Sequence, residues 1–249
     1  MIVFPNCKIN LGLHVLAKRK DGFHELETVF YPLPLHDILD IVYLEKMTGK
    51  PGVPFLQTGL PIPSDGSNNL CVKAFWLLKK KFPQMASVQM HLHKLIPAGG
   101  GLGGGSADAA FTLLVLNEIC HLKLSTAQLL KYAAQLGSDC PFFIINKPCF
   151  SRGRGEKLEK ITVDLSPYNI ILVNPGIHID TGAMFKEIKP GMPKTLLKEI
   201  IAGPIENWKA ELKNDFEEVV FPLHPEIAKI KDELYKAGAL YASLSGSGS

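Results

Sequence analysis

Short apolar runs separated by turn-forming residues occupy the first part of the chain, and they predict strands. Along Ile9–Val15, apolar residues alternate with polar or small ones, which is typical of a half-buried strand. The runs Leu26–Phe30 and Ile38–Leu44 predict two more short strands, separated by two prolines. Residues 46–68 are rich in Gly, Pro, Ser and Asp, so we expect a loop there with room for a short hairpin.

From residue 69 onward, the apolar residues take the spacing of helices. One apolar face and three closing lysines predict a helix over 69–81, and strict alternation over 88–93 predicts a strand. A helix is expected over 107–119, with Ser106 as its N-cap and Asp108 as its first-turn acid. Further along we expect a helix over 125–136 capped by Ser125, a buried strand at 170–173, and helices near 193–202, 206–219 and 225–237.

The composition is that of an ordinary globular protein. Apolar residues make up 46% of the 249 positions and charged residues 20%, which excludes a disordered or fibrous chain. No run of the sequence has the apolar length of a membrane span. The first fifteen residues, interrupted by Pro5 and Lys8, resemble neither a signal peptide nor a transit peptide. We therefore expect a cytoplasmic protein without membrane association.

Length and charge suggest a protein of one large or two modest domains that handles small anions. The composition shifts towards Gly, Arg and Glu after Pro148, and we expect two domains, 1–155 and 156–249. A net charge of +3 is too mild to predict a nucleic-acid partner. The expected partner is a small-molecule substrate, and the expected assembly is a monomer or homodimer.

Cysteines and histidines give no firm disulfide or metal site. The five cysteines are odd in number and widely spaced, without a Cys-x-x-Cys pair, which disfavours both a disulfide framework and a zinc site. His91 and His93 form a His-x-His pair on an expected strand. With no third ligand in evidence, a solvated strand face is the favoured interpretation.

The most informative feature is the segment Gly99–Gly105, in which six glycines fall within seven residues between a strand and a helix. Glycine can adopt positive φ and approach a ligand closely, and the helix start adds unpaired N–H groups, so this loop can hold a phosphate chain. A flexible linker is the alternative, although two or three glycines would suffice for a turn. A Walker A loop would need a lysine where Ser106 stands. A Rossmann fingerprint would need an acid about twenty residues on, where residues 121–127 have none.

Motifs along the whole chain resemble, in order, those of the GHMP kinase superfamily. The segment Leu95–Ala110 is similar to the second superfamily motif, of the type Pro-x-x-x-Gly-Leu-Gly-Ser-Ser-Ala-Ala. The other similar segments are Pro5–Leu11, Asp21–Thr28, Leu136–Phe142 and Leu244–Ser249, the last matching the start of the third, glycine-rich motif. The segments around His24 and Asp139 resemble one branch and differ from mevalonate, homoserine and galactose kinases.

The resemblance implies a two-domain α+β GHMP kinase fold. Its N-terminal ATP-binding domain would be ribosomal protein S5 domain 2-like, and its C-terminal α+β domain would bind substrate. With ATP and Mg²⁺, such a kinase would phosphorylate the 2-hydroxyl of a cytidine diphosphate-linked methylerythritol, in the non-mevalonate route to isoprenoid precursors. Two alternatives stay open: another GHMP kinase of a small alcohol, or a catalytically silent nucleotide- or RNA-binding module. Against the family, we expect the C-terminal domain to be about 30–45 residues short of a final strand and helix.

The resemblance further implies that Asp139 is the general base and that Lys8 assists it. From the residues alone, Asp139 is equally well a helix cap or turn residue, and a lone strand lysine is ordinarily solvated. As base, Asp139 would accept the proton of the attacking hydroxyl. Lys8 would lower the pKa of Asp139 or of that hydroxyl and stabilise phosphate charge. Asn10 shares the strand face of Lys8 and would bond substrate or Asp139.

The implied ATP-binding residues are those of the glycine loop together with three outside it. Ser106 would also supply a hydroxyl to Mg²⁺, while Asp108 is either a cap-region acid or a metal-associated carboxylate. Taken without the family, Asn69 is a good helix N-cap. The full set is Pro97, Ala98, Gly99, Gly100, Gly101, Leu102, Gly103, Gly104, Gly105, Ser106, Asn69, Leu70 and Lys94.

The implied substrate site is aromatic. Phe23 and His24 stand where the family stacks on and hydrogen-bonds to a cytosine ring, and both contacts are what recognition of a base requires. Phe23 replaces the usual tyrosine, which keeps stacking but removes a hydroxyl contact. Phe185 is implied as the opposing ring. The other implied substrate residues are Asn10, Phe30, Arg154 and Thr181, the last near the diphosphate; core packing or a surface charge is the alternative for the aromatic residues and Arg154.

Overall fold

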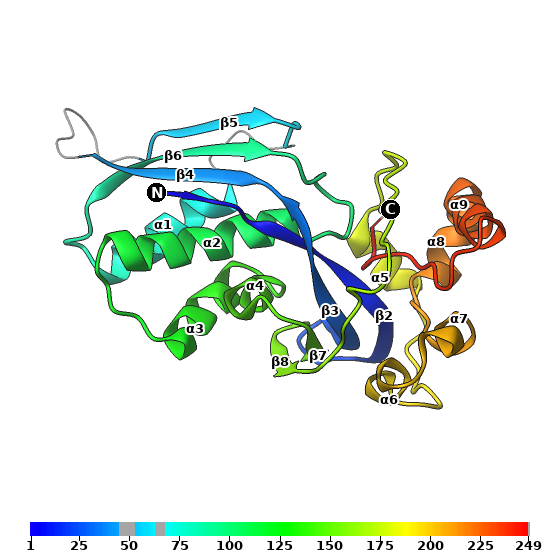
Figure 1. Ribbon diagram of the computed structural model, residues 1–249. Helices are drawn as coiled ribbons and strands as arrows, with labels where there is room; N and C mark the ends of the chain where they lie inside the picture. Colours follow the sequence, from blue (N-terminus) through cyan, green and yellow to red (C-terminus); the bar gives the residue numbers. More distant parts are fainter. Residues whose placement is uncertain (45–52, 63–67, 249) are drawn as a thin grey trace. The chain divides into compact units, whose positions relative to one another are not determined.

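The computed structural model describes residues 1–44, 53–62 and 68–248 and divides into two compact units (Figure 1). Unit 1 comprises Met1–Cys7, Pro32–Ala98 and Gly103–Asn146, and unit 2 comprises Lys8–Tyr31, Gly99–Leu102 and Lys147–Ser249. Each unit has its own apolar core. The sequential domains predicted above, 1–155 and 156–249, stay a prediction.

A mixed sheet forms one layer of unit 1. Its strands are β1 (Ile2–Val3), β4 (Ile38–Leu44), β5 (Phe55–Gly59) and β6 (Ser87–Lys94), in the order β1-β4-β6-β5. The antiparallel pairing of β4 with β6 places Ile38 opposite His93, and it confirms the strands expected at 38–44 and 88–93.

Strand β5 lies within residues 46–68, where the sequence predicts a loop with room for a short hairpin. It pairs parallel with β6, with Phe55 opposite Met90, so it is not the arm of a local hairpin. The surrounding turn-forming residues hid it, because its partner lies more than thirty positions further on. Residues 46–52 and 63–67 of the expected loop lie outside the described residues.

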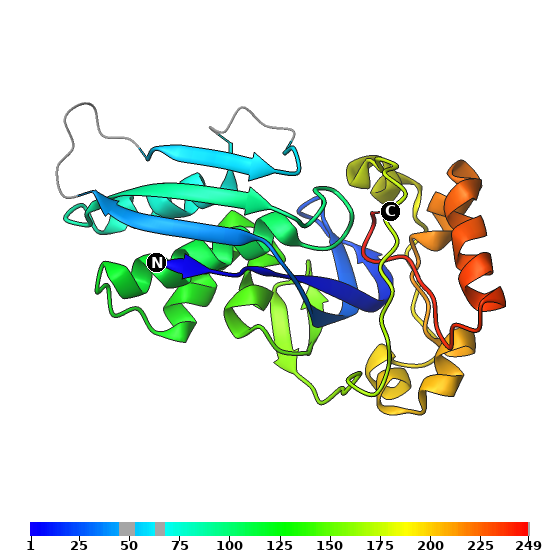
Figure 2. The same cartoon turned by 45° about the horizontal axis from the view of Figure 1, so that its top comes forward.

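Helices form the other layer of unit 1. They are α1 (Leu70–Lys81), α2 (Gly104–Ile119), α3 (Thr126–Leu136) and α4 (Cys140–Ile145). Helices α1 and α2 cover one face of the sheet in both views (Figures 1 and 2), and their apolar residues share a core with β4 and β6. Two predicted helix starts are confirmed: the Asn69 side chain accepts from the Cys71 amide, and Ser125 forms a capping box with Gln128.

The predicted start of the helix over 107–119 is wrong. Helix α2 begins at Gly104, and its N-cap is Gly103, in the left-handed conformation with φ 71°. Ser106 therefore lies inside the first turn and does not cap the helix. A glycine N-cap exposes its backbone without needing a side-chain acceptor, which is why the serine further along was mistaken for the cap.

The sheet of unit 2 has the order β2-β3-β7-β8. Its strands are β2 (Asn6–Lys18), β3 (His24–His36), β7 (Cys149–Gly153) and β8 (Lys157–Lys160). The chain passes from one unit to the other within β2 and within β3. Strand β3 extends past the predicted end at Phe30 through two prolines. Its pairing with β7 ends at Phe30, so the prolines, which lack a backbone donor, fall beyond that ladder.

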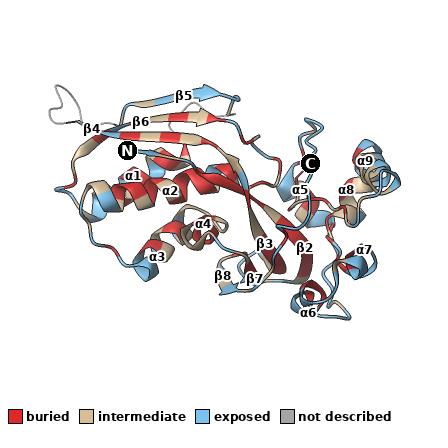
Figure 3. Cartoon of the chain, viewed as in Figure 1, coloured by how far each residue is buried: buried red, intermediate tan, exposed pale blue. Residues whose placement is uncertain are grey.

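Short helices complete unit 2. They are α5 (Thr181–Glu187), α6 (Leu197–Ala202), α7 (Trp208–Glu211) after a 3₁₀ turn (Ile205–Asn207), α8 (Glu217–Leu223) and α9 (Pro225–Lys236). Helix α9 confirms the prediction for 225–237, and α6 is the shorter form of 193–202. Their apolar side chains pack with the inward face of β2 and with β3 and β7, which Figure 3 colours as buried.

Two predictions in unit 2 are wrong. The single helix expected over 206–219 is broken between α7 and α8, because Asn214 there bridges to Leu13 of β2. The buried strand expected at 170–173 is neither a strand nor buried: Ile171 is 71% exposed, and its neighbours are at least 40% exposed. The apolar run was correct evidence for strand propensity, but in the described part of the chain it pairs with no strand. Helix α5 was not expected.

Candidate active site

The glycine-rich loop joins β6 to α2. Its backbone turns through positive φ at Gly99, Gly101 and Gly103, conformations that residues with a Cβ rarely adopt. Helix α2 starts without a side-chain cap. Its first N–H groups therefore have no intrahelical acceptor, and with the helix dipole they suit an anion.

In unit 2, the loop packs directly on the C-terminal glycine-rich segment. A Cβ at Gly101 would overlap the carbonyl oxygen of Ser245, and a Cβ at Gly248 would lie 2.5 Å from the Gly101 nitrogen. The two glycine motifs singled out in the sequence are thus in backbone contact. Only glycine allows this approach at Gly101.

Lys8 is buried and points its ammonium group at this loop. Nζ donates to the Gly101 carbonyl at 2.8 Å and to Oδ1 of Asn10 at 2.6 Å, and it lies 5.0 Å from the centre of the Phe30 ring. The face of β2 that carries Lys8 is therefore buried as well as the face that carries Leu11, and the solvated alternative for this lysine is excluded. Phe30 is buried, and its contact with Lys8 connects it to the site.

Asn10 connects Lys8 to two further elements of unit 2. Its Nδ2 donates to Oγ1 of Thr28 at 2.8 Å, and its backbone N–H donates to Oγ of Ser245 at 3.2 Å. The predicted sharing of one strand face by Lys8 and Asn10 is borne out by their direct bond. Thr28 and Ser245 lie within the family motifs Asp21–Thr28 and Leu244–Ser249, but their contacts could not be assigned from sequence.

Four of the predicted substrate residues form two stacked pairs in unit 2. The guanidinium of Arg154 lies 4.5 Å from the centre of the exposed Phe23 ring, and the imidazole of His24 stacks on Phe185 with ring centres 4.9 Å apart. Burial lowers the pKa of His24 below its ordinary value, and nearby Lys18 lowers it further. A neutral imidazole offers one donor and one acceptor.

Thr181 stands at the start of α5 and meets the C-terminal glycine-rich segment. Its Oγ1 is 2.8 Å from Oγ of Ser247. The predicted substrate threonine and the third glycine motif are therefore brought together in unit 2.

In unit 1, Ser106 and the segment of Asp139 lie together. Burial raises the pKa of the Cys140 thiol to about 12, against an opposing hydrogen bond with Ser106, so Ser106 contacts the residue next to Asp139. Asp139 is half-buried at the start of α4, where its side chain makes no capping hydrogen bond. Lys8 belongs to unit 2 and Asp139 to unit 1. Their joint action stays a prediction.

Lys94 lies between two buried carboxylates of unit 1. Its Nζ bonds to Asp37 and, at 2.8 Å, to Asp108. Burial lowers the pKa of Lys94, but Asp108 and Asp37 together outweigh burial and raise it. Asp108 is therefore a buried ion-pair partner inside α2, and its description as a first-turn cap acid is wrong. Burial raises the pKa of Asp108 to about 7, although Lys94 opposes this.

Asp37 was missed by the sequence analysis. Its Oδ1 accepts from the backbone N–H groups of Leu95 at 2.6 Å and Ile96 at 2.9 Å, so it fixes the segment that enters the glycine loop. Nothing local marks Asp37, because its partners lie 57 to 59 positions away.

The predicted nucleoside side lies where α1 and α2 begin. Asn69 is buried as the cap of α1, and a Cβ at Gly105 would be 3.9 Å from the Leu70 side chain. The structure thus places Leu70 against the first turn of α2. Asn69 serves as a cap, as the alternative interpretation had it, and a contact with the base stays a prediction.

A metal site is not formed by clustered side chains in the part of the chain that the structure describes, where no three His, Cys, Asp or Glu residues gather around one point. His91 and His93 both bond to Oγ1 of Thr58, at 2.9 and 2.8 Å. Among the described residues, every helix is too short or too polar to cross a bilayer.

Comparisons with known proteins identify the fold and the family of this chain. Residues 69–147 match the GHMP kinases N terminal domain, and residues 196–249 match the GHMP kinases C terminal domain. A crystal structure of 4-(cytidine 5'-diphospho)-2C-methyl-D-erythritol kinase superposes with a TM-score of 0.78 at 29% identity, covering 100% of this chain and 88% of that one. Mevalonate kinase of Methanococcus jannaschii, at 12% identity and a TM-score of 0.67, shares the fold. This chain is therefore a member of the GHMP kinases and has their two-domain α+β fold.

Curated relatives identify the family within the GHMP kinases to which this chain belongs. A 4-diphosphocytidyl-2-C-methyl-D-erythritol kinase of Azobacteroides pseudotrichonymphae is 51% identical over 100% of this chain and 91% of its own length. The enzyme of the same name in Bacteroides fragilis is 50% identical over 100% of this chain and 90% of its own length. The chain therefore belongs, among the GHMP kinases, to the family of the 4-diphosphocytidyl-2-C-methyl-D-erythritol kinases.

Proposed function

We propose that this chain transfers the γ-phosphoryl group of ATP to the 2-hydroxyl of 4-diphosphocytidyl-2-C-methyl-D-erythritol. The observation that carries the proposal is the buried ammonium of Lys8, held 2.8 Å from the carbonyl of Gly101 in the glycine loop. A fixed cation beside a backbone that suits phosphate is what phosphoryl transfer needs, since its catalysis is mainly positioning and charge stabilisation. Family membership at half identity supports the choice of substrate.

Asp139 is proposed as the base that accepts the proton of the attacking hydroxyl, and Lys8 as the cation that stabilises charge on the transferring phosphoryl group. General-base assistance is worth roughly 10²–10⁴ in rate. The glycine loop and the start of α2 would hold the triphosphate through backbone N–H groups. Asn69 and Leu70 would lie beside the nucleoside.

The two stacked pairs are proposed to bind the cytosine. Phe23 with Arg154 and His24 with Phe185 offer ring faces for stacking, and a neutral His24 can bond to the edge of a base. Thr181, already bonded to Ser247, is proposed to contact the diphosphate of the substrate.

Mg²⁺ is proposed to bind together with the triphosphate at the start of α2. Mg²⁺ keeps several waters and takes few protein ligands beside substrate phosphates, so the half-buried hydroxyl of Ser106 at the start of α2 would suffice on the protein side. Asp108 is committed to Lys94 and is not proposed as a ligand. The ion would neutralise charge on the triphosphate.

A coupled kinase assay with ATP, Mg²⁺ and the cytidylyl substrate tests the proposal. We expect turnover by the wild type, and a kcat lower by about 10²–10⁴ in Asp139→Asn with an unchanged circular dichroism spectrum. Asp164→Asn, at an exposed turn, is the matched control and should keep wild-type kcat. Near-normal turnover in Asp139→Asn would overturn the role of the base.

The same assay separates the alternatives. Phosphorylation of mevalonate or homoserine, but not of the cytidylyl substrate, would assign another GHMP kinase activity. Binding of ATP without transfer to any of the three alcohols would assign a silent nucleotide-binding module.

A further inference from the structure

Asn214 sits in the break between α7 and α8, on backbone that is fastened to β2. The N–H of Leu13 donates to the carbonyl of Lys213, and the N–H of Asp215 donates to the carbonyl of Leu13, both at 2.9 Å. Asn214 therefore has a fixed place relative to the strand that carries Lys8.

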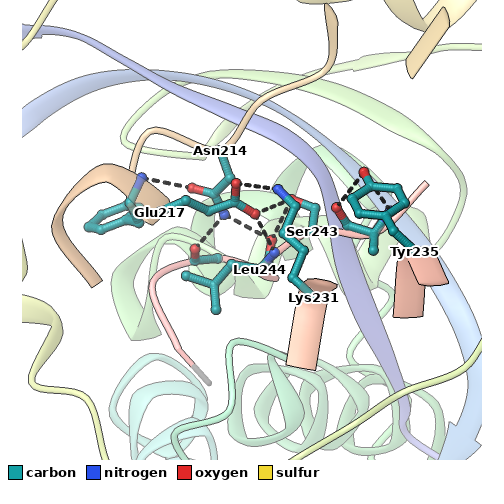
Figure 4. Close-up of polar contacts among 9 residues, drawn as sticks. Asn214, Glu217, Lys231, Tyr235, Ser243 and Leu244 are labelled. Atoms are coloured by element: carbon teal, nitrogen blue, oxygen red, sulfur yellow. Dashed lines mark hydrogen bonds and ion pairs between the residues drawn. The ribbon is translucent and has the colours of Figure 1, made fainter. Parts of the chain in front are cut away.

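The side chain of Asn214 uses its polar atoms on backbone groups. Nδ2 donates to the carbonyls of Leu244 at 2.9 Å and Gly246 at 2.8 Å, and Oδ1 accepts from the N–H of Phe216 at 3.0 Å (Figure 4). The amide is 2% exposed, so water does not replace these bonds. The two carbonyls flank Ser245, whose place is thereby fixed from both sides.

Glu217 holds the same segment at its beginning. Oε1 accepts from the N–H of Leu244 at 2.9 Å and from the hydroxyl of Ser243 at 3.2 Å, while Oε2 bonds to Lys231 at 2.6 Å (Figure 4). Charge-assisted bonds of this kind are stronger than neutral ones. Residues 244–248, here called the 244–248 segment, are thus anchored by one buried amide and one carboxylate.

From the 244–248 segment, the bonds continue to Lys8. The hydroxyl of Ser245 accepts from the N–H of Asn10 at 3.2 Å and lies 3.4 Å from the carbonyl of Gly101. That same carbonyl accepts from Nζ of Lys8 at 2.8 Å. All of these residues belong to unit 2.

We infer that Asn214 is a positioning residue for Lys8: by fixing the 244–248 segment against the glycine loop, it fixes the carbonyl on which the Lys8 ammonium rests. The inference rests on the proposed function, because it gives the place of Lys8 a kinetic meaning. A misplacement of about 1 Å in a catalytic group can cost about 100-fold in rate. No local sequence pattern marks this role.

The test uses Asn214→Asp, which keeps the shape and the Oδ1 acceptor but turns a carboxylate oxygen towards two carbonyl oxygens. We expect kcat to fall about 100-fold, while the KM for the cytidylyl substrate changes by less than about threefold.

The second readout needs no substrate: lysines are acetylated with acetic anhydride, and the labelled peptides are measured by mass spectrometry. Labelling of Lys8 should become about fivefold faster as its cradle loosens, while labelling of Lys94, buried in unit 1, should keep its rate.

The matched control is Asn117→Asp. Asn117 likewise uses its side-chain amide on backbone groups, in its case the carbonyl and the N–H of Leu124 at 3.2 and 2.8 Å, so the same substitution also turns a carboxylate oxygen towards a carbonyl. We expect Asn117→Asp to keep the wild-type rate of Lys8 labelling. An equal rise in Lys8 labelling in both variants would overturn the inference, as would wild-type labelling and kcat in folded Asn214→Asp.

A milder variant covers the case in which Asn214→Asp does not fold. Ser245→Ala removes only the hydroxyl between Asn10 and Gly101, and we expect Lys8 labelling to rise and kcat to fall about threefold to tenfold. Unchanged labelling in Ser245→Ala would overturn the inference. If the wild type shows no kinase activity, the proposed function fails, and the labelling comparison still decides the position of Lys8.

Discussion

At the residue scale, Lys94 neutralises two carboxylates in the interior of unit 1. Its side chain is 3% exposed, and those of Asp37 and Asp108 are as deeply buried. Above the pKa of Asp108, which is about 7, this group is charged, and in Lys94→Met both carboxylates lose their cation, so we expect the free energy of unfolding to fall by about 3–5 kcal/mol. Urea titration measures this loss.

Lys198→Met is the control for Lys94→Met. Lys198 pairs with Glu159 in a bridge whose side chains are about half exposed, and such surface pairs contribute about 0–1 kcal/mol. Equal losses in the two variants would contradict the burial argument.

Asp108 gives the stability of the protein a pH dependence of unusual sign. Its pKa of about 7, against an ordinary 3.8, means that between about pH 4 and 7 the folded state holds a proton that the unfolded chain has released. Stability from this group therefore declines as the pH rises through that window. In Asp108→Asn the free energy of unfolding should decline less with pH between 5 and 7.5 than in the wild type. Parallel curves from urea titrations at several pH values would contradict the raised pKa.

Whether the role of a residue could be predicted depends on how near its partners lie in the sequence. Lys8 and Asn10 could be placed on one strand face because a strand has a period of two. The partnership of Lys94 with Asp37 spans 57 positions, and Asn214 reaches residues about thirty positions away. No periodicity or spacing rule connects such pairs, so only the fold could reveal them.

At the scale of elements, the contact between the two glycine motifs of unit 2 requires Gly101. Its φ is +68°, and a Cβ there would overlap the carbonyl oxygen of Ser245. In Gly101→Ala we expect this contact to open and kcat to fall about 100-fold. Steady-state kinetics with a thermal melt provide the measurement.

Gly176→Ala is the control that separates the steric overlap at Gly101 from the backbone strain of an alanine at positive φ. Gly176 has φ +74° with nothing within 4 Å of its Cβ position, so the substitution strains only the backbone, at about 1–2 kcal/mol. It should lower the melting temperature and leave kcat unchanged. If Gly101→Ala also keeps kcat, the contact has no role in the reaction.

Elements with strong local signals were predicted well. Helix α1 has a cap, an amphipathic face and closing lysines within its own sequence, and α3 has a capping box. Where distant pairing decides, prediction failed: β5 forms on β6, and the link from Asn214 to β2 ends α7. The exposed run at 170–173 shows the converse: it has strand propensity, but among the described residues it pairs with no strand, and propensity alone does not make a strand.

At the scale of the whole molecule, the family followed from motifs spread along the full sequence rather than from any one element. The fold class could be predicted because the glycine loop and the flanking motifs are local, and the match to the GHMP kinase domains confirmed it. The apolar cores of the units could be predicted from the sequence only in part. The core of unit 2 combines residues of β2 and β3 with residues of helices almost two hundred positions later.

The threading of the chain also limits how the protein can be divided. It passes between the units within β2, within β3, on both sides of Gly99–Leu102, and after Asn146. Any single cut in this interval therefore leaves both units without part of their backbone. A recombination event with one crossover could therefore not exchange one unit between two relatives as an intact module. The two units are inherited together, and a redesign has to treat them together.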